Sequence, residues 1–181
     1  MDNHAYHIFS IPVPVSEEHV DKYRELRLLA LTTNPEAFGS KYEDNVDKTR
    51  AQWRAMIDTP ERFTAVARVL STGEWAGMAS ILTPEMAGQH TGDTGPNPHL
   101  LVGMWVRPAH RRKGLGKRLI GAGIEWVRTR TEGMPDKKRQ VTLEVHRHNE
   151  SAKALYDGLG FVVTDGECED SNRIPMFVVA K

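Results

Sequence analysis

A run of basic residues followed by two closely spaced glycines carries the clearest chemical signal in this sequence. Residues 106–118 read Val-Arg-Pro-Ala-His-Arg-Arg-Lys-Gly-Leu-Gly-Lys-Arg, where a predicted strand ends and a predicted helix begins. Cations in the first turn of a helix oppose its macrodipole, so Lys113, Lys117 and Arg118 are unfavourable there unless an anion lies among them. The first-turn N–H groups lack partners within the helix and can bind a phosphate. Gly114 and Gly116 leave room for its approach, and the stretch therefore predicts a diphosphate site.

Three known phosphate-binding patterns compete for this stretch, and two of them fail. A Walker A loop needs glycine at position 111 and serine or threonine at position 118, but Arg111 and Arg118 stand there. A dinucleotide fingerprint beginning at Gly114 needs a third small residue where Leu119 stands. What remains is Arg-x-x-Gly-x-Gly, which ends at Gly116 and resembles the acetyl-CoA loop of the Gcn5-related N-acetyltransferases (GNATs).

A second stretch, near the C-terminus, extends this resemblance. Its residues follow the order and spacing of the second half of the GNAT cofactor domain: Leu143-Glu144-Val145, Asn149, Ala152, Leu155-Tyr156 and Leu159-Gly160-Phe161. The two stretches together span residues 101–164, roughly a third of the chain. The segment Pro35–Ser40 is also similar to the first interhelical loop of many family members.

The resemblance implies that acetyl-CoA is the co-substrate and that its pantetheine arm lies in a gap between two splayed strands. The backbone of Met104, Trp105 and Val106 would pair with this arm, and one N–H group would polarise the thioester carbonyl as an oxyanion hole does. Asn149 and Ala152 would contact the arm as well. The diphosphate would be held by Arg111, Arg112, Lys113, Gly114, Leu115, Gly116 and Lys117. No metal is expected, because His146 and His148 have no further ligand at metal-binding spacing.

The transfer reaction needs a base for the amine and an acid for the sulfur. A lysine-type amine has a pKa of about 10.4 and is mostly protonated at neutral pH. Glu144 is the predicted base, because strand alternation places its side chain opposite those of Leu143 and Val145; a relay water could stand in for it. A structural role for an exposed strand glutamate remains open. By resemblance, Tyr156 protonates the departing thiolate, although it could instead pack its helix.

The acceptor amine is less well defined by the sequence. We expect Phe38, Ser40, Tyr42 and Glu43 beside the amine pocket, and the acid-rich segment Asp165–Arg173 to attract a cationic amine. A polyamine, an antibiotic, an amino acid and a protein N-terminus all remain open. The short chain favours a small-molecule or peptide amine.

The pattern of apolar residues predicts the elements that position these groups. Strands are expected at 6–15, 63–70, 75–82, 99–106, 140–146, 161–164 and 174–180, and helices at 16–33, 44–57, 114–130 and 149–158. Residues 84–98 carry several glycines and prolines and are predicted to form a long loop. This order describes an α+β fold with a mixed, mostly antiparallel sheet of about seven strands and about four flanking helices. By resemblance, the sheet splays at the acyl-CoA cleft.

Composition sets wider limits. The 181 residues are 27% charged and 39% hydrophobic, with 24 basic and 24 acidic side chains, so a single domain over residues 1–181 is expected. Neutral charge and the absence of aromatic residues between His110 and Arg118 disfavour a nucleic-acid partner. One cysteine, Cys168, and the lack of a leader or a long apolar run favour a cytoplasmic protein without membrane contact.

Taken together, the sequence predicts an acyl-CoA-dependent N-acetyltransferase that moves an acetyl group to a primary amine by direct attack in a ternary complex. The alternative is a non-catalytic module that binds acyl-CoA as a sensor or regulatory subunit. Homodimers are frequent in the family that the sequence resembles, so a homodimer is compatible with it.

Overall fold

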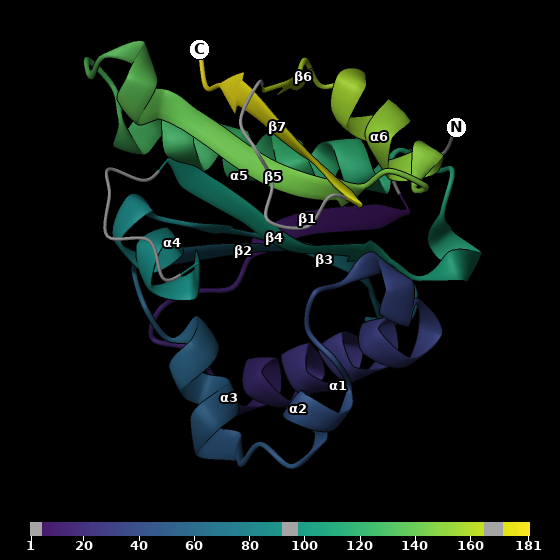
Figure 1. Cartoon of the computed structure of the whole chain (residues 1–181). Coiled ribbons are helices and arrows are strands. Elements are labelled where there is room, and N and C mark those ends of the chain that lie inside the picture. The colour runs from purple at the N-terminus through teal and green to yellow at the C-terminus, as the bar shows by residue number, and fades with distance from the viewer. Residues whose placement is uncertain (1–4, 92–97, 165–171) are drawn as a thin grey trace.

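A seven-stranded sheet forms the centre of the protein, shown as a computed structural model that describes residues 5–91, 98–164 and 172–181 (Figure 1). In chain order the strands are β1 (Tyr6–Ser10), β2 (Arg62–Val69), β3 (Trp75–Leu82), β4 (His99–Val106), β5 (Gln140–His146), β6 (Val162–Val163) and β7 (Arg173–Val179). Their order in the sheet is β1-β2-β3-β4-β5-β7-β6. Neighbouring strands are antiparallel except β4 and β5, which are parallel. The predicted mixed, mostly antiparallel sheet is confirmed.

Helices cover both faces of this sheet (Figure 1). The α-helices are α1 (Glu17–Thr33), α2 (Glu43–Val46), α3 (Arg50–Ile57), α4 (Pro84–Thr91), α5 (Leu115–Arg130) and α6 (Glu150–Asp157), and short 3-10 turns occur at η1 (Pro35–Ala37), η2 (Pro108–His110) and η3 (Asp136–Arg139). In Figure 1, α1, α2 and α3 lie below the sheet and α5 and α6 lie on its other face. No helix in the described part of the chain is both long and apolar enough to cross a membrane.

Two hydrophobic cores result from this layering. On β2, Ala65 belongs to the core beneath α5, and its neighbour Val66 belongs to the core beneath α1 and α3, because successive strand residues point to opposite faces. All residues of β3 are buried, which is expected of a strand covered on both sides. Gly123 allows α5 to lie close to the sheet, since a Cβ atom built there would meet Ile81 Cδ1 at 2.6 Å.

The structure corrects the prediction for residues 84–98. Pro84–Thr91 is helix α4 rather than loop. Pro84 occupies the first helical position, which tolerates the missing N–H, and the Thr83 carbonyl accepts from Ala87 N at 2.8 Å. The apolar periodicity of these eight residues is weak because the helix is short, so the pattern was not visible in the sequence. The rest of the predicted loop, residues 92–97, lies outside the described residues.

Two other predicted elements have different bounds in the structure. The first strand ends at Ser10 instead of Val15. The second predicted helix is divided into α2 and α3, because Thr49 begins a new helix. Its side chain accepts from Gln52 N and the Gln52 side chain accepts from Thr49 N, which is a reciprocal capping box. Together with α4, this division brings the number of α-helices in the described residues to six, more than the four or so that the sequence predicts.

The sheet splays open between its two parallel strands. β4 and β5 pair only at His99↔Val141 and Leu100↔Thr142. Beyond these pairs, β4 continues beside β3 and β5 continues beside β7. The pairing of β3 with β4 is irregular between Met78 and Ser80, and Gly103 on β4 has a φ of 63°. The facing edges of the two strands thus separate and leave backbone groups available to a ligand.

Candidate functional site

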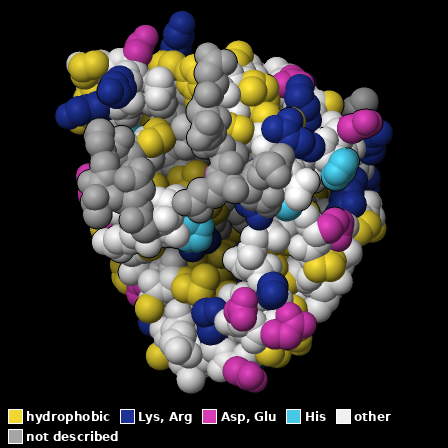
Figure 2. Space-filling view, viewed as in Figure 1, with side chains coloured by type: hydrophobic (Ala, Val, Ile, Leu, Met, Phe, Trp, Pro, Cys, Tyr) yellow, Lys and Arg dark blue, Asp and Glu magenta, His cyan; other side chains and the backbone are white. Residues whose placement is uncertain are grey.

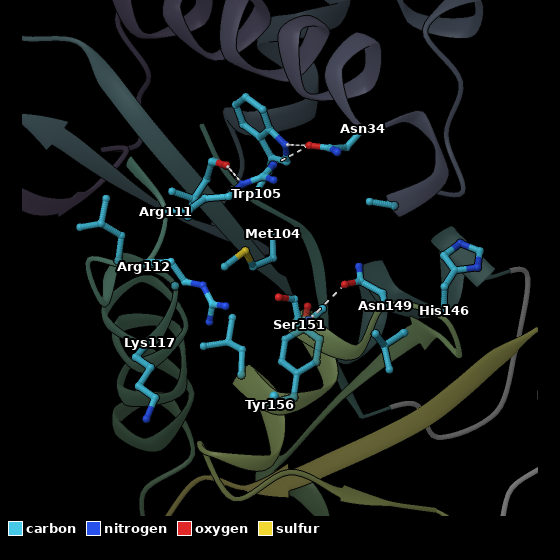
Figure 3. Close-up of a pocket in the computed structure, with 18 of the residues that line it drawn as sticks. Asn34, Met104, Trp105, Arg111, Arg112, Lys117, His146, Asn149, Ser151 and Tyr156 are labelled. Carbon is cyan, nitrogen blue, oxygen red and sulfur yellow. Dashed lines mark hydrogen bonds between the residues drawn. The ribbon is translucent and has the colours of Figure 1, made fainter. Parts of the chain in front are cut away.

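A cavity of about 790 Å³ opens where β4 and β5 separate (Figure 3). Its walls come from the C-terminal ends of these strands, the N-terminal end of α5, helix α6 and the end of α1 with η1. Of the residues predicted from the sequence, those that line it are Met104, Trp105, Val106, Arg111, Arg112, Gly114, Leu115, Gly116, Lys117, Glu144, Asn149, Ala152 and Tyr156. Lys113 does not line the cavity. The fold therefore brings both halves of the sequence motif to one place.

The loop before α5 and the first turn of this helix present a row of backbone N–H groups that have no partner among the described residues. None of the N–H groups from Arg112 to Lys117 donates a hydrogen bond to another described residue, and the first helical bond at this end is Arg118 N to Gly114 O at 3.2 Å. Arg112 has a φ of 60° and Gly114 a φ of 75°. Left-handed residues at such a turn direct successive N–H groups into a concave nest that binds anions. This geometry fits a diphosphate.

The basic side chains of this loop point in different directions, and only some of them reach the cavity without a partner. Arg111 donates from Nε to Val106 O at 2.9 Å and from Nη2 to Asn34 Oδ1 at 2.5 Å, so its guanidinium fixes the end of β4. Lys113 donates to the Tyr6 hydroxyl at 3.1 Å and points to β1. Arg112 and Lys117 line the cavity, and among the described residues neither forms a hydrogen bond or an ion pair.

Gly116 brings three walls of the cavity together. A Cβ atom built at this position would lie 2.8 Å from both Leu155 Cδ2 and Met104 Cε. Real Cβ atoms do not approach other atoms so closely. Glycine at position 116 therefore lets α5 begin against both β4 and α6.

Asn34 is a cavity residue that sequence analysis missed. Its Oδ1 accepts from Trp105 Nε1 at 3.0 Å and from Arg111 Nη2 at 2.5 Å, and Figure 3 shows these contacts. Asn34 stands at the C-terminal end of α1, where the sequence predicts only that a helix ends. The remaining cavity residues, to which the sequence assigned no role in the site, are Glu36, Ala37, His110, Val145, His146, His148, Ser151, Ala154 and Leu155.

Asn149 and Tyr156 belong to α6. Asn149 is the N-cap, and its Oδ1 accepts from Ala152 N at 3.1 Å, so its amide nitrogen stays available to a ligand. Tyr156 is buried, and its ring packs edge-on against Phe161. Burial raises the pKa of the Tyr156 hydroxyl to about 12, because the charged tyrosinate is disfavoured away from water. The hydroxyl is thus protonated throughout the neutral range.

Glu144 faces the cavity from β5, while Leu143 and Val145 on either side of it are buried, as the alternation predicted. Its carboxylate forms an ion pair with Arg173 of β7, with Nη1 and Oε2 separated by 3.3 Å. The Glu144 side chain is 46% exposed. Water therefore reaches this carboxylate, and an arginine holds it in place.

The residues predicted beside the acceptor do not line this cavity. Phe38, Ser40, Tyr42 and Glu43 all lie outside its walls. The loop that carries Phe38 nevertheless passes close to the predicted base, because a Cβ atom built at Gly39 would lie 3.0 Å from Arg173 Nη2. Most of the acid-rich segment Asp165–Arg173, residues 165–171, lies outside the described residues.

Comparison with known proteins agrees with this architecture. Residues 23–161 match the model of the Acetyltransferase (GNAT) family. This match covers more than half of the chain and both motif stretches, so the protein belongs to the GNAT acetyltransferase family, whose members use acetyl-CoA. No curated protein matches the sequence significantly.

Solved structures share the fold at low sequence identity. A GNAT-family acetyltransferase from Streptococcus pneumoniae has a TM-score of 0.69 and 18% identity, over 96% of this chain and 98% of that one. A GNAT-family acetyltransferase from Staphylococcus aureus Mu50 has a TM-score of 0.68 and 13% identity, over 98% and 100% of the two chains. The ribosomal L7/L12 α-N-protein acetyltransferase RimL, solved with coenzyme A, has a TM-score of 0.65 and 11% identity, over 99% and 96%.

Proposed function

We propose that this protein transfers an acetyl group from acetyl-CoA to the primary amine of a small molecule or peptide by direct attack in a ternary complex. The observation that carries this proposal is the row of free N–H groups from Arg112 to Lys117, which faces a cavity between two splayed strands. A diphosphate followed by a long polar arm matches both parts of this site.

In this proposal the cofactor lies along the edge that β4 exposes. The diphosphate binds to the N–H groups before α5, with Arg112 and Lys117 beside it. The pantetheine arm pairs with backbone groups of Met104–Val106 and with the amide of Asn149. One N–H group of β4 donates to the thioester oxygen and stabilises the negative charge that develops there.

The transfer requires that the amine lose a proton and that the departing thiolate be stabilised. The amine nitrogen attacks the carbonyl carbon, the new C–N bond forms and the C–S bond breaks. The nitrogen loses a proton through a water molecule to Glu144, whose partly exposed carboxylate is held by Arg173. Tyr156 keeps its proton at neutral pH and donates it in a hydrogen bond to the departing sulfur. Because a raised pKa makes it a weak acid, its main effect is to stabilise the thiolate.

Calorimetric titration with acetyl-CoA, with ATP and a short DNA duplex as controls, tests the cofactor assignment. Saturable binding of acetyl-CoA alone supports it, and no binding at millimolar acetyl-CoA contradicts it. An amine panel with detection of released thiol then tests turnover. Tight binding of acetyl-CoA without thiol release from any amine would favour the alternative, a non-catalytic acyl-CoA sensor.

A further inference from the structure

An unpaired arginine is buried beside the cavity. Arg27 on α1 is 9% exposed, and its Nη1 is buried without a hydrogen-bond partner. The described residues provide no hydrogen-bond acceptor and no carboxylate for this guanidinium. Burial is the main cause that lowers the pKa of Arg27. Removing a cation from water is costly unless an anion compensates it. The buried Arg27 guanidinium therefore lacks the anionic partner that would offset this cost.

The residues around Arg27 do not supply this partner. Its guanidinium lies 4.6 Å from the centroid of the Phe38 ring, and such a contact offsets only part of the cost of burying a cation. Among its neighbours, Tyr23 raises the pKa of Arg27, and Arg62, a second cation, lowers it. Burial, followed by Arg62 and Arg27, lowers the pKa of His90. Two arginines, Arg27 and Arg62, thus lie on the α1 side of the sheet, where Arg62 donates to the Tyr23 hydroxyl at 2.7 Å.

The Arg27 guanidinium lies beside two segments that also contribute residues to the cavity wall. It touches Phe38, and its Nη1 is the atom nearest to a Cβ built at Gly103, at 3.9 Å. Ala37, which precedes Phe38, and Met104, which follows Gly103, both line the cavity. Figure 2, in the same view as Figure 1, shows a hollow between the sheet and α1–α3. Basic and histidine side chains lie near hydrophobic ones there. A ligand bound beside Phe38 and Gly103 would contact Arg27 and the end of β4 together.

We propose that Arg27 binds a carboxylate group of the acceptor, so that the substrate is an amine that also carries a carboxylate, as an amino acid or a short acidic peptide does. The inference rests on the proposed function, because it places the acceptor on the α1 side of β4, opposite the nest that binds the diphosphate. A planar guanidinium matches a carboxylate with two parallel hydrogen bonds. Because Arg27 Nη1 lies 3.9 Å from a Cβ built at Gly103, the bound carboxylate lies beside the strand end that also carries Met104.

Pairs of acceptors that differ only in this group test the inference. The panel consists of the standard amino acids and short peptides, each compared with its C-terminal or side-chain amide. For the preferred pair, the wild-type protein should acetylate the carboxylate with a kcat/KM about 10 to 100 times that of the amide, as expected for hydrogen bonds to a charged group. Equal kcat/KM values for acids and amides throughout the panel would overturn the proposal.

Two substitutions of Arg27 separate recognition from packing. Arg27→Met keeps an unbranched side chain and removes the charge, so it should reduce the acid-to-amide ratio of kcat/KM to near one through a higher KM for the acid. Arg27→Lys keeps the charge but not the planar pair of donors, and it should restore part of the ratio. Arg24→Met is the matched control, because Arg24 is exposed on the same helix. A full ratio in Arg27→Met contradicts the inference.

Binding measurements keep this test separate from catalysis. Acetyl-CoA titrations establish that each variant retains a folded cofactor site. Titration of the acetyl-CoA complex with the acid and its amide then measures recognition without turnover. Binding of the acid that is lost in Arg27→Met, with no transfer in the wild type, would support the carboxylate site and reject the proposed activity. Turnover of amides and acids alike would support the activity and reject the carboxylate site.

Discussion

Trp105 donates a hydrogen bond from Nε1 to Asn34 Oδ1 at 3.0 Å, across 71 positions of the sequence. Arg111 donates to the same oxygen at 2.5 Å. One amide thus connects the C-terminal end of α1 to the end of β4 and to the loop before α5. The wall on the acceptor side and the anion nest share this support, so a change in Asn34 should affect both.

Asn34→Ala should destabilise the fold and weaken acetyl-CoA binding. The substitution leaves the buried Trp105 Nε1–H without an acceptor, at a cost of about 1–3 kcal/mol, and frees the Arg111 guanidinium to move. Chemical denaturation measures the first effect and calorimetry the second. Asn34→Asp keeps an acceptor oxygen for both donors but loses the bond from Asn34 Nδ2 to Glu36 Oε1, so it should recover only part of the lost stability. An unchanged denaturation midpoint in Asn34→Ala would show that water replaces the lost bond.

Tyr156→Phe should lower kcat and leave acetyl-CoA affinity nearly unchanged. Phenylalanine keeps the edge-on contact with Phe161 but removes the hydrogen bond to the departing sulfur. A hydrogen bond to a charged group contributes about 1.5–3 kcal/mol, which corresponds to a decrease in kcat of about 10- to 100-fold. Steady-state kinetics with a saturating amine measure it. A variant with wild-type kcat would remove Tyr156 from the mechanism.

The features that sequence analysis predicted well are local ones. The Arg111 to Gly116 pattern depends on which residues stand at a strand-to-helix junction, and the structure places a nest of free N–H groups there. The orientation of Glu144 also follows from neighbouring residues, through strand alternation. Such features depend on a few successive residues.

The features that were missed depend on contacts distant in sequence. The pairing of Asn34 with Trp105 and that of Glu144 with Arg173 join separate elements, and no local pattern indicates them. Lys113 fits the anion site by its sequence position, yet its side chain turns to Tyr6 of β1. Arg27 did leave a signal, because it stands on the same helical face as the buried Tyr23 and Ala30 and interrupts an apolar stripe.

Gly116→Glu should abolish acetyl-CoA binding at micromolar concentrations. The new side chain would begin 2.8 Å from Met104 Cε and Leu155 Cδ2 and place a negative charge where the diphosphate binds. We expect the affinity measured by calorimetry to fall by about 100-fold or more. Unimpaired binding would refute the assignment of the loop.

Two control variants separate the effect of the added negative charge from the effect of the close contacts at position 116. Gly121→Glu adds the same carboxylate to α5 where a new Cβ has no neighbour within 4 Å, and its affinity for acetyl-CoA should stay close to wild type. Gly116→Ala introduces the close contacts without the charge, and we expect an intermediate affinity. If Gly116→Ala binds as weakly as Gly116→Glu, packing alone explains the loss.

The buried Tyr156 should also affect how stability depends on pH. Its pKa of about 12 in the folded protein lies above the value of about 10 for an unfolded chain. Below pH 10 the tyrosine is protonated in both states and favours neither. As the pH rises from 10 towards 12, only the unfolded tyrosine ionises, so the folded state loses stability, about 3 kcal/mol in total. The free energy of unfolding of the wild type and of Tyr156→Phe is measured by chemical denaturation from about pH 8 to about pH 11. The difference between the two curves isolates the contribution of Tyr156 from that of the other tyrosines. The wild type should lose stability more steeply than the variant above pH 10, and parallel curves would show that Tyr156 titrates normally.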